Sequence, residues 1–505
     1  GVNLAQDGKL AIAALGDGTI RWYRWSDGKE LLALFVHKPD KRWVAWTPTG
    51  YYMASPGGED LIGWHMNRGW DQPPDFFPAS RFRDRFSRPD IVQKVLVTLD
   101  EDEAVAEADA EARRKPTEAS PIESRLPPVV RITSPKDGAG VSGDTVTLDY
   151  ALRSPSGLPV EAIDVLIDGR PISATRGVQR VDEAAQAGCP GIVTRGVAPA
   201  GARSPTGEVL CRITVPVPSR TVEVGLIARS GQTSSVPALV RLVAGGGDGS
   251  APRGRLIVLA VGVSDYADVS LRLGLAAKDA LDFAKAFEAQ KGALYGEVLV
   301  KSLVDGAATR SNVLDGLDWL EKQRPTAQDV AVVFLAGHGM TDEKGSFWFL
   351  PSDVRASNLR SSAVSQDDLR RTLQSLPSKA IVFLDACHAG RAAGPVSQQK
   401  RGNVDMNAVV NDLSTAENGV VTFASSMGRE LSHENLEWGN GAFTKAVLEG
   451  VRDGKADIFG KGRITISQLD AFIANRVAEL TDQQQHAVMT RPPTIADFPV
   501  AAVRN

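Results

Sequence analysis

Strongly apolar runs recur through the second half of this chain of 505 residues. VLAVGV, VAVVFLA, IVFLDA and VVTFA are each long enough for one strand, and segments of helical periodicity such as LAAKDALDFAKAFEAQ lie between them. Strands that lack a polar face are typical of a parallel sheet covered by helices on both sides. The sequence therefore predicts an α/β domain with a mostly parallel sheet over residues 252–505.

Three other regions precede this domain, and two of them predict β structure. Residues 1–70 alternate short aromatic-rich strands with Asp-Gly turns, which resembles about one and a half WD40-type propeller blades. Because such blades need neighbours to bury their faces, we expect the chain to be the C-terminal part or a processed product of a longer protein. Residues 71–128 predict a helix with an apolar stripe from Ile91 to Leu99 that then turns acidic and solvated, followed by a linker. Residues 129–244 predict an immunoglobulin-like sandwich of short alternating strands.

Composition argues against some classes of function. The chain has 57 Lys and Arg residues against 61 Asp and Glu residues, so no general basic field exists for nucleic acid. No apolar run reaches the roughly 18 residues of a membrane span, and no signal peptide opens the chain. We therefore expect a cytoplasmic protein whose N-terminal β regions bind a protein partner or regulator.

Cysteine is sparse in this chain. Only Cys189, Cys211 and Cys387 are present, without a Cys-x-x-Cys pair, so no structural zinc site is expected. Cys189 and Cys211 are expected to be two unrelated small buried residues. A disulfide between them is the alternative if the compartment is oxidising.

Candidate chemistry follows two of the apolar strands. His338 follows VAVVFLA and Cys387 follows IVFLDA. Sites in open α/β sheets lie beyond the carboxyl ends of the strands, so these side chains face each other if the two strands are neighbours. A thiol needs a base to become a thiolate near neutral pH, and histidine titrates in the required range. His388 adjoins Cys387 but is a poor base, because adjacent side chains diverge. The alternative is a core thiol and an unrelated loop histidine.

The two motifs together resemble a known family. FLAGHGM, followed 49 residues after its histidine by the cysteine of DACHAG, is similar to the caspase-like cysteine peptidases, and closest to metacaspases and paracaspases. The resemblance covers Arg255 to about Val477. It implies a caspase-type fold, peptidase activity and a dyad of Cys387 and His338. It also implies an oxyanion hole formed by the backbone N–H groups of Gly339 and Cys387.

The same resemblance implies the residue preferred before the cut bond. It places Asp385 and Asp279 in the S1 pocket, and two carboxylates there favour Arg or Lys at P1. A surface position on the helix is the alternative for Asp279. Many metacaspases carry serine where this chain has Ala336, which leaves one pocket contact open.

No cofactor or metal is expected, and Ca²⁺ is the alternative. Some metacaspases need calcium, and Asp353, Asp367 and Asp368 lie where such acids would be. Gly394 has no carboxylate to complete the set, and Ca²⁺ takes six or more oxygen ligands. Solvated loop acids are therefore the favoured interpretation.

The segment after the nucleophile strand carries a candidate self-cleavage site. Residues 391–418 are polar and rich in Gly, Ser, Gln and Asn, which predicts an exposed loop. The loop contains Lys400 and Arg401, so we expect processing after Arg401 or, as the second choice, after Lys400. A soluble patch without processing is the alternative.

These observations predict a cysteine endopeptidase that cleaves protein substrates after Arg or Lys. The runner-up is a scaffold or adaptor in which the caspase-like fold persists without activity.

Overall fold

The computed structural model describes residues 1–503 apart from residues 6–7, 39, 71, 115–120, 142, 173–207, 219, 232, 245–252, 343–345, 356, 387–405, 429 and 431. The predictions for Cys189, Cys387, His388, Gly394, Lys400 and Arg401 therefore fall outside the described residues.

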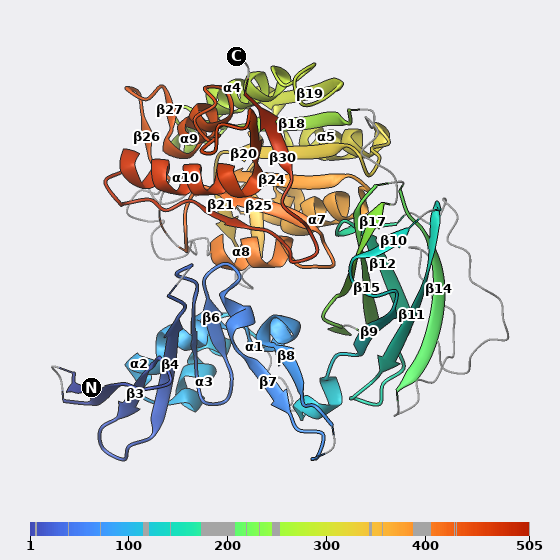
Figure 1. The fold of residues 1–505 in the computed structure, drawn as a ribbon. Helices are drawn as coiled ribbons and strands as arrows, with labels where there is room; N and C mark the ends of the chain where they lie inside the picture. Colours follow the sequence, from blue (N-terminus) through green and yellow to red (C-terminus); the bar gives the residue numbers. More distant parts are fainter. Residues whose placement is uncertain are drawn as a thin grey trace.

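A six-stranded sheet forms the centre of the C-terminal domain (Figure 1). Its strands, in spatial order, are β19 (Glu297–Val304), β18 (Arg255–Gly262), β20 (Val330–Ala336), β24 (Lys379–Asp385), β25 (Val420–Ala424) and β29 (Val488–Thr490). The first five run parallel and β29 is antiparallel. The predicted α/β class with a mostly parallel sheet is confirmed.

Helices cover both faces of this sheet, which is why the central strands have no polar side. One face packs against α5 (Arg310–Lys322), α7 (Gln366–Ser375) and α8 (Met406–Leu413). The other packs against α4 (Ala276–Glu288), α9 (Ala442–Val451) and α10 (Ile466–Leu480). Alternate residues of each strand enter the two cores, as the period of two requires: Ile257 and Leu259 enter the first, Leu256 and Val258 the second.

Helix α8 corrects the loop predicted over residues 391–418. Its side chains Met406, Val409, Val410 and Leu413 are buried against the sheet. Their spacing of three and four residues gives one apolar helix face, although polar residues surround it in the sequence. The second half of the predicted loop is therefore part of the core.

The N-terminal unit comprises the described residues up to Arg114, and we call it the meander unit. It is built on one continuous antiparallel meander. Its strands follow chain order: β1 (Val2–Leu4), β2 (Leu10–Ala14), β3 (Thr19–Arg24), β4 (Glu30–Val36), β5 (Trp43–Trp46) and β6 (Tyr52–Ala54). A propeller blade has four strands, whereas these six form a single sheet. The relation to WD40-type blades stays a prediction.

Two helices pack on the meander and correct the predicted solvated acidic stretch. α2 (Pro89–Thr98) and α3 (Glu101–Glu111) share a core with the sheet. Ala104 and Ala108 of α3 are buried, one turn apart, while most of the acidic side chains lie outside. Because alanine gives only a narrow apolar face, the acidic residues dominate the sequence pattern of this helix.

A two-sheet sandwich follows the meander unit in the chain. The first sheet contains β14 (Val209–Pro216), β11 (Thr145–Arg153) and β9 (Val129–Ser134). The second contains β10 (Ala139–Val141), β17 (Ala238–Ala244), β15 (Val222–Ser230), β12 (Ala162–Ile167) and β13 (Arg170–Pro171). One apolar core lies between them. This architecture agrees with the predicted sandwich, and its kinship with immunoglobulin domains stays a prediction.

Arg170 joins the sandwich to the α/β domain. Its guanidinium group is buried and donates to the carbonyl oxygens of Asn418, at 2.8 Å, and Gly419, at 2.7 Å. It also donates to the carbonyls of Leu373 and Leu376 at the end of α7. Carbonyl groups at a helix C-terminus carry partial negative charge and stabilise a cation there.

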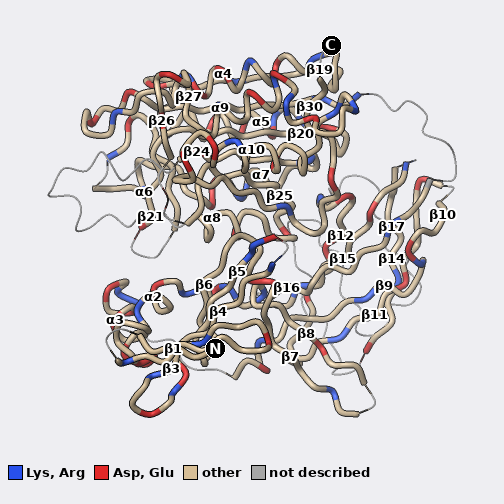
Figure 2. Tube along the Cα trace, turned by 60° about the vertical axis from the view of Figure 1, so that its left-hand side comes forward, with Lys and Arg blue, Asp and Glu red and all other residues tan. Residues whose placement is uncertain are grey.

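The meander unit also contacts the α/β domain. The backbone N–H of Gly57 donates to Oδ1 of Asn411 in α8 at 2.8 Å, and Arg81 forms an ion pair with Glu417. The three units therefore adjoin one another (Figure 1). Basic and acidic residues are interspersed along the traces of all three (Figure 2), in keeping with the near-even charge balance.

Cys211 in β14 is disulfide-bonded, which corrects the prediction that it is unpaired. Its partner lies outside the described residues. Disulfides persist in oxidising compartments, and the cytoplasmic location stays a prediction. No helix within the described ranges is long and apolar enough to cross a membrane.

Candidate active site

The ends of β20 and β24 lie side by side, as expected for His338 and Cys387. Ala336 pairs with Asp385 across the two strands, and the N–H of Gly337 donates to the carbonyl of Asp385 at 3.0 Å. Gly339 approaches the next residue so closely that a Cβ there would lie 2.5 Å from the carbonyl oxygen of Ala386. The histidine segment thus contacts the residue that immediately precedes Cys387.

His338 is completely buried and held at two points. Its backbone N–H donates to the hydroxyl oxygen of Tyr266 at 2.8 Å. Its ring Nε2 lies 2.8 Å from the carbonyl oxygen of Leu271. A carbonyl can only accept, so Nε2 carries the proton in this contact and the neutral ring has its lone pair on Nδ1. In this tautomer Nδ1 is the ring nitrogen able to accept a proton.

Gly337 allows this arrangement. Its φ of 151° is rarely adopted by residues with a side chain, and a Cβ there would lie 2.7 Å from the Tyr266 hydroxyl. A glycine is needed for Tyr266 to reach the backbone of His338.

Asp279 and Asp385 are both buried, each with 2% of its surface exposed. Asp279, in the first turn of α4, accepts from Nδ2 of Asn440 at 2.8 Å and from the N–H of Gly441 at 3.1 Å. Oδ2 of Asp385 accepts from the Thr444 hydroxyl at 3.3 Å, whereas its Oδ1 has no hydrogen-bond partner among the described residues. The surface-residue alternative for Asp279 is therefore wrong.

The two carboxylates meet at Gly441. A Cβ on Gly441 would lie 3.1 Å from Oδ2 of Asp279 and 3.5 Å from Oδ2 of Asp385. Burial, together with the negative charge of Asp385, raises the pKa of Asp279 to about 8. The two carboxyl groups therefore do not both ionise at neutral pH, and a cation bound beside them would favour ionisation of both.

Several residues of this site had no signal in the sequence. Tyr266, Leu271, Thr444 and the pair Asn440-Gly441 contribute a hydroxyl, a carbonyl or an N–H whose role depends only on where the chain folds back. Ala336 stands where many metacaspases carry serine, so it has no hydroxyl to offer to the pocket. The hydroxyl of Thr444 donates to Asp385 in this chain. The dipeptide Asn-Gly before a helical pattern marks a turn, but not its contact with Asp279.

The acids considered for Ca²⁺ have local structural roles. Asp353 accepts from the N–H of Arg310 at 2.8 Å, Asp367 pairs with Arg370, and Asp368 forms a capping box with Ser365 at the start of α7. The part of the chain that the structure describes contains no group of three residues suited to hold a metal ion.

Gly339 begins the hairpin of β21 (Gly339–Thr341) and β22 (Phe347–Phe349). Its oxyanion-hole role needs Cys387 as partner and stays a prediction.

Comparison with known proteins agrees with this fold. Residues 255–498 match the family model of the caspase domain, which covers the six-stranded sheet of the α/β region and its helices. A search of curated proteins gave no match.

Solved structures give more distant likenesses. Protein GSU0716 from Geobacter sulfurreducens is 19% identical, with a TM-score of 0.34, over 50% of this chain and 95% of its own. The Ig1-2 module of the Drosophila receptor protein tyrosine phosphatase DLAR is 16% identical, with a TM-score of 0.15, over 28% of this chain and 62% of its own. Raptor from Chaetomium thermophilum is 16% identical, with a TM-score of 0.23, over 39% of this chain and 18% of its own. Likenesses at this level carry no conclusion about function.

Proposed function

We propose that this chain is a cysteine endopeptidase that cleaves proteins after Arg or Lys, with Cys387 as nucleophile and His338 as base. One observation carries the proposal: His338 is fixed through Nε2 at the end of a strand whose neighbour leads directly into Cys387. A cysteine and a base at adjoining strand ends form the minimum machinery for acyl transfer.

The reaction follows from this arrangement. Nδ1 of His338 takes the thiol proton, and the Cys387 sulfur attacks the scissile carbonyl carbon. The N–H groups of Gly339 and Cys387 would stabilise the negative charge on the carbonyl oxygen. The leaving amine takes the proton from His338, and water then hydrolyses the thioester with His338 again as the base.

The specificity proposal rests on the two buried carboxylates. Asp385 has one oxygen without a described partner. Asp279 and Asp385 both lie against Gly441. A guanidinium or ammonium group at P1 would neutralise them in a site with little water, where such contacts are strong.

The raised pKa of Asp279 predicts a pH dependence. Below about pH 8 this carboxyl group is protonated in the free enzyme, so binding of a cationic P1 side chain must release the proton. We expect kcat/KM for an Arg-P1 peptide to rise with pH up to about 8 and then to level off. Asp279→Asn removes the titrating carboxyl group. The ratio of wild-type to variant kcat/KM should therefore rise, as the pH is raised toward 8, by up to about tenfold per pH unit.

Any group that titrates alike in both enzymes cancels in this ratio. A ratio that stays constant from about pH 6 to pH 9 would contradict the role of Asp279.

We further propose self-cleavage after Arg401, or after Lys400 as the second choice. The dibasic pair matches the proposed P1 preference. The two products should stay associated, because β24 and β25 on either side of this segment share one sheet. Mass spectrometry of purified wild-type protein should show two fragments, and Cys387→Ala should stay intact. An uncut segment in fully active enzyme would show that activity does not need this cleavage.

The alternative function is a scaffold that retains the caspase fold without activity. A fluorogenic Arg-P1 peptide, offered to wild type and to Cys387→Ala, separates the two functions. Turnover by the wild type alone supports the peptidase, and no turnover by either supports the scaffold. The N-terminal β units are proposed to bind a protein partner or regulator in both cases.

A further inference from the structure

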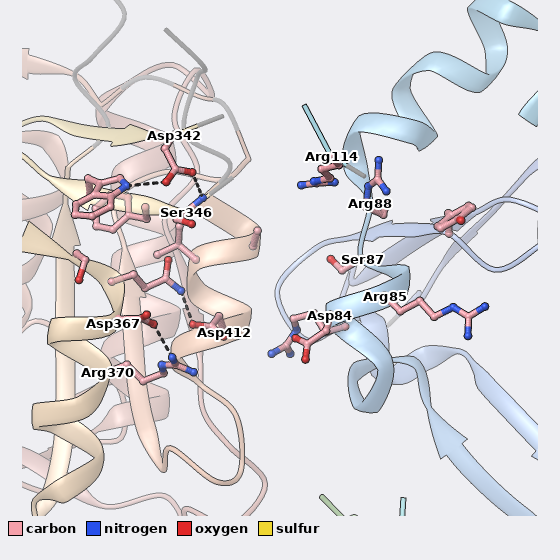
Figure 3. Close-up of a pocket in the computed structure, with 18 of the residues that line it drawn as sticks. Asp84, Arg85, Ser87, Arg88, Arg114, Asp342, Ser346, Asp367, Arg370 and Asp412 are labelled. Carbon is pink, nitrogen blue, oxygen red and sulfur yellow. Dashed lines mark hydrogen bonds and ion pairs between the residues drawn. The ribbon is translucent and has the colours of Figure 1, made fainter. Parts of the chain in front are cut away.

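A cavity of about 1020 Å³ lies between the meander unit and the α/β domain (Figure 3). We call it the interunit crevice. Its wall on the meander side includes Asp84, Ser87, Arg88 and Arg114. Its other wall comes from the β21–β22 hairpin, α7, α8 and the short helix α6 (Leu359–Ser362). A cavity of this size at a unit boundary is typical of small-molecule sites.

The interunit crevice is separate from the proposed active site but adjoins both of its chain segments. None of its lining residues takes part in the contacts of His338, Asp279 or Asp385 described above. The β21–β22 hairpin directly follows His338, and α8 is the first described element after the nucleophile strand. A ligand in the crevice would therefore contact the elements that follow the base and the nucleophile.

Arginine dominates the lining. Eight arginines and five aspartates line the crevice. Glu59 and Asp90 pair with lining arginines from outside the crevice, so the balance is positive by one charge with all eight arginines and is neutral when Arg85 is left out. Arg85 points away from the α/β domain, whereas Arg88 and Arg114 lie on the side that faces it (Figure 3).

Most of the carboxylates are already engaged. Asp109 pairs with Arg88 at 2.8 Å and Asp367 with Arg370 at 2.5 Å. Asp342 accepts from the N–H of Ser346 and from Nε1 of Trp348, and Asp412 accepts from Gln366. These contacts partly neutralise the acids and hold them in place.

Two arginines on the α/β wall of the crevice lack an ion pair with a described carboxylate. Arg360 and Arg371 are exposed and form no ion pair with any described acid. Arg88 and Arg114 carry their charges on the opposite wall. A ligand with two or more anionic groups would be able to contact cations on both walls, and the planar guanidinium fork suits phosphate oxygens.

We propose that the interunit crevice binds a small molecule that carries several phosphate groups. The proposal goes beyond the peptidase activity and does not depend on it. Binding can therefore be measured on the full chain with Cys387→Ala, which also prevents self-cleavage during the experiment.

The test is isothermal titration calorimetry with inorganic tripolyphosphate as the probe. We expect saturable binding of one equivalent, and a loss of affinity of about tenfold or more in the double variant Arg360→Ala, Arg371→Ala. Arg114→Ala, on the opposite wall, should weaken binding as well. Arg463→Ala is the matched control, because Arg463 is exposed, lies outside the crevice and forms no ion pair with a described residue.

Thermal melts verify that each variant is folded, which is expected because Arg360 and Arg371 are exposed. Absence of binding at millimolar tripolyphosphate would overturn the proposal. Equal affinity of the double variant and wild type would do the same, since the anion would then bind elsewhere. Tighter binding of a glutamate-rich peptide than of tripolyphosphate would reject the phosphate assignment.

Discussion

Replacement of His338 by alanine should lower kcat/KM for an Arg-P1 peptide by about 10²- to 10⁴-fold, the usual contribution of a general base. In the proposed mechanism Nδ1 of His338 takes the thiol proton, because Nε2 donates to the carbonyl of Leu271. The measurement is steady-state hydrolysis of a fluorogenic peptide. Cys387→Ala, which removes the nucleophile itself, should leave no measurable turnover.

His338 is buried, so folding must be measured in parallel by circular dichroism and thermal melting. His338→Gln serves as a second variant, because it fills more of the space and has no basic nitrogen. His65→Ala is the control, since His65 is an exposed residue of the meander unit. Near wild-type turnover in a folded His338 variant would show that another group is the base.

Replacement of Asp385 by asparagine should have opposite effects on activity and stability. The substitution conserves shape but removes a buried charge, and a cation in a buried pair loses about 3–5 kcal/mol when its partner is removed. We therefore expect kcat/KM for Arg-P1 peptides to fall by about 10²- to 10⁴-fold. The Tm of the free protein should rise, because Asp385 places its charge against Asp279 and one of its oxygens has no described partner.

Asp453→Asn is the matched control, because Asp453 is exposed and, among the described residues, forms an ion pair only with the adjacent Arg452. Efficient cleavage after Asp by the wild-type enzyme would contradict the basic P1 preference. Unchanged hydrolysis of Arg-P1 peptides by Asp385→Asn would remove Asp385 from the pocket.

The fold could be predicted where the sequence pattern is local. The strand β20 ends two residues before His338 and β24 ends two residues before Cys387, as the apolar runs indicate. Thr309 caps α5 through its side chain at the position where the helical pattern begins. Prediction missed the burial of α3 and missed α8 altogether, because a narrow face of alanines and a short apolar face inside a polar segment both resemble solvated chain.

The sequence by itself determined the main apolar strands of the α/β domain and put the histidine and the cysteine at strand ends. Those properties depend on periodicity and apolar runs, which act over a few residues. Only the tertiary structure decided that β20 pairs with β24, that Leu271 fixes the ring of His338 from 67 residues away, and that Gly441 contacts Asp279 across 162 residues. Such contacts depend on how the layers pack, and packing joins residues that no local pattern connects.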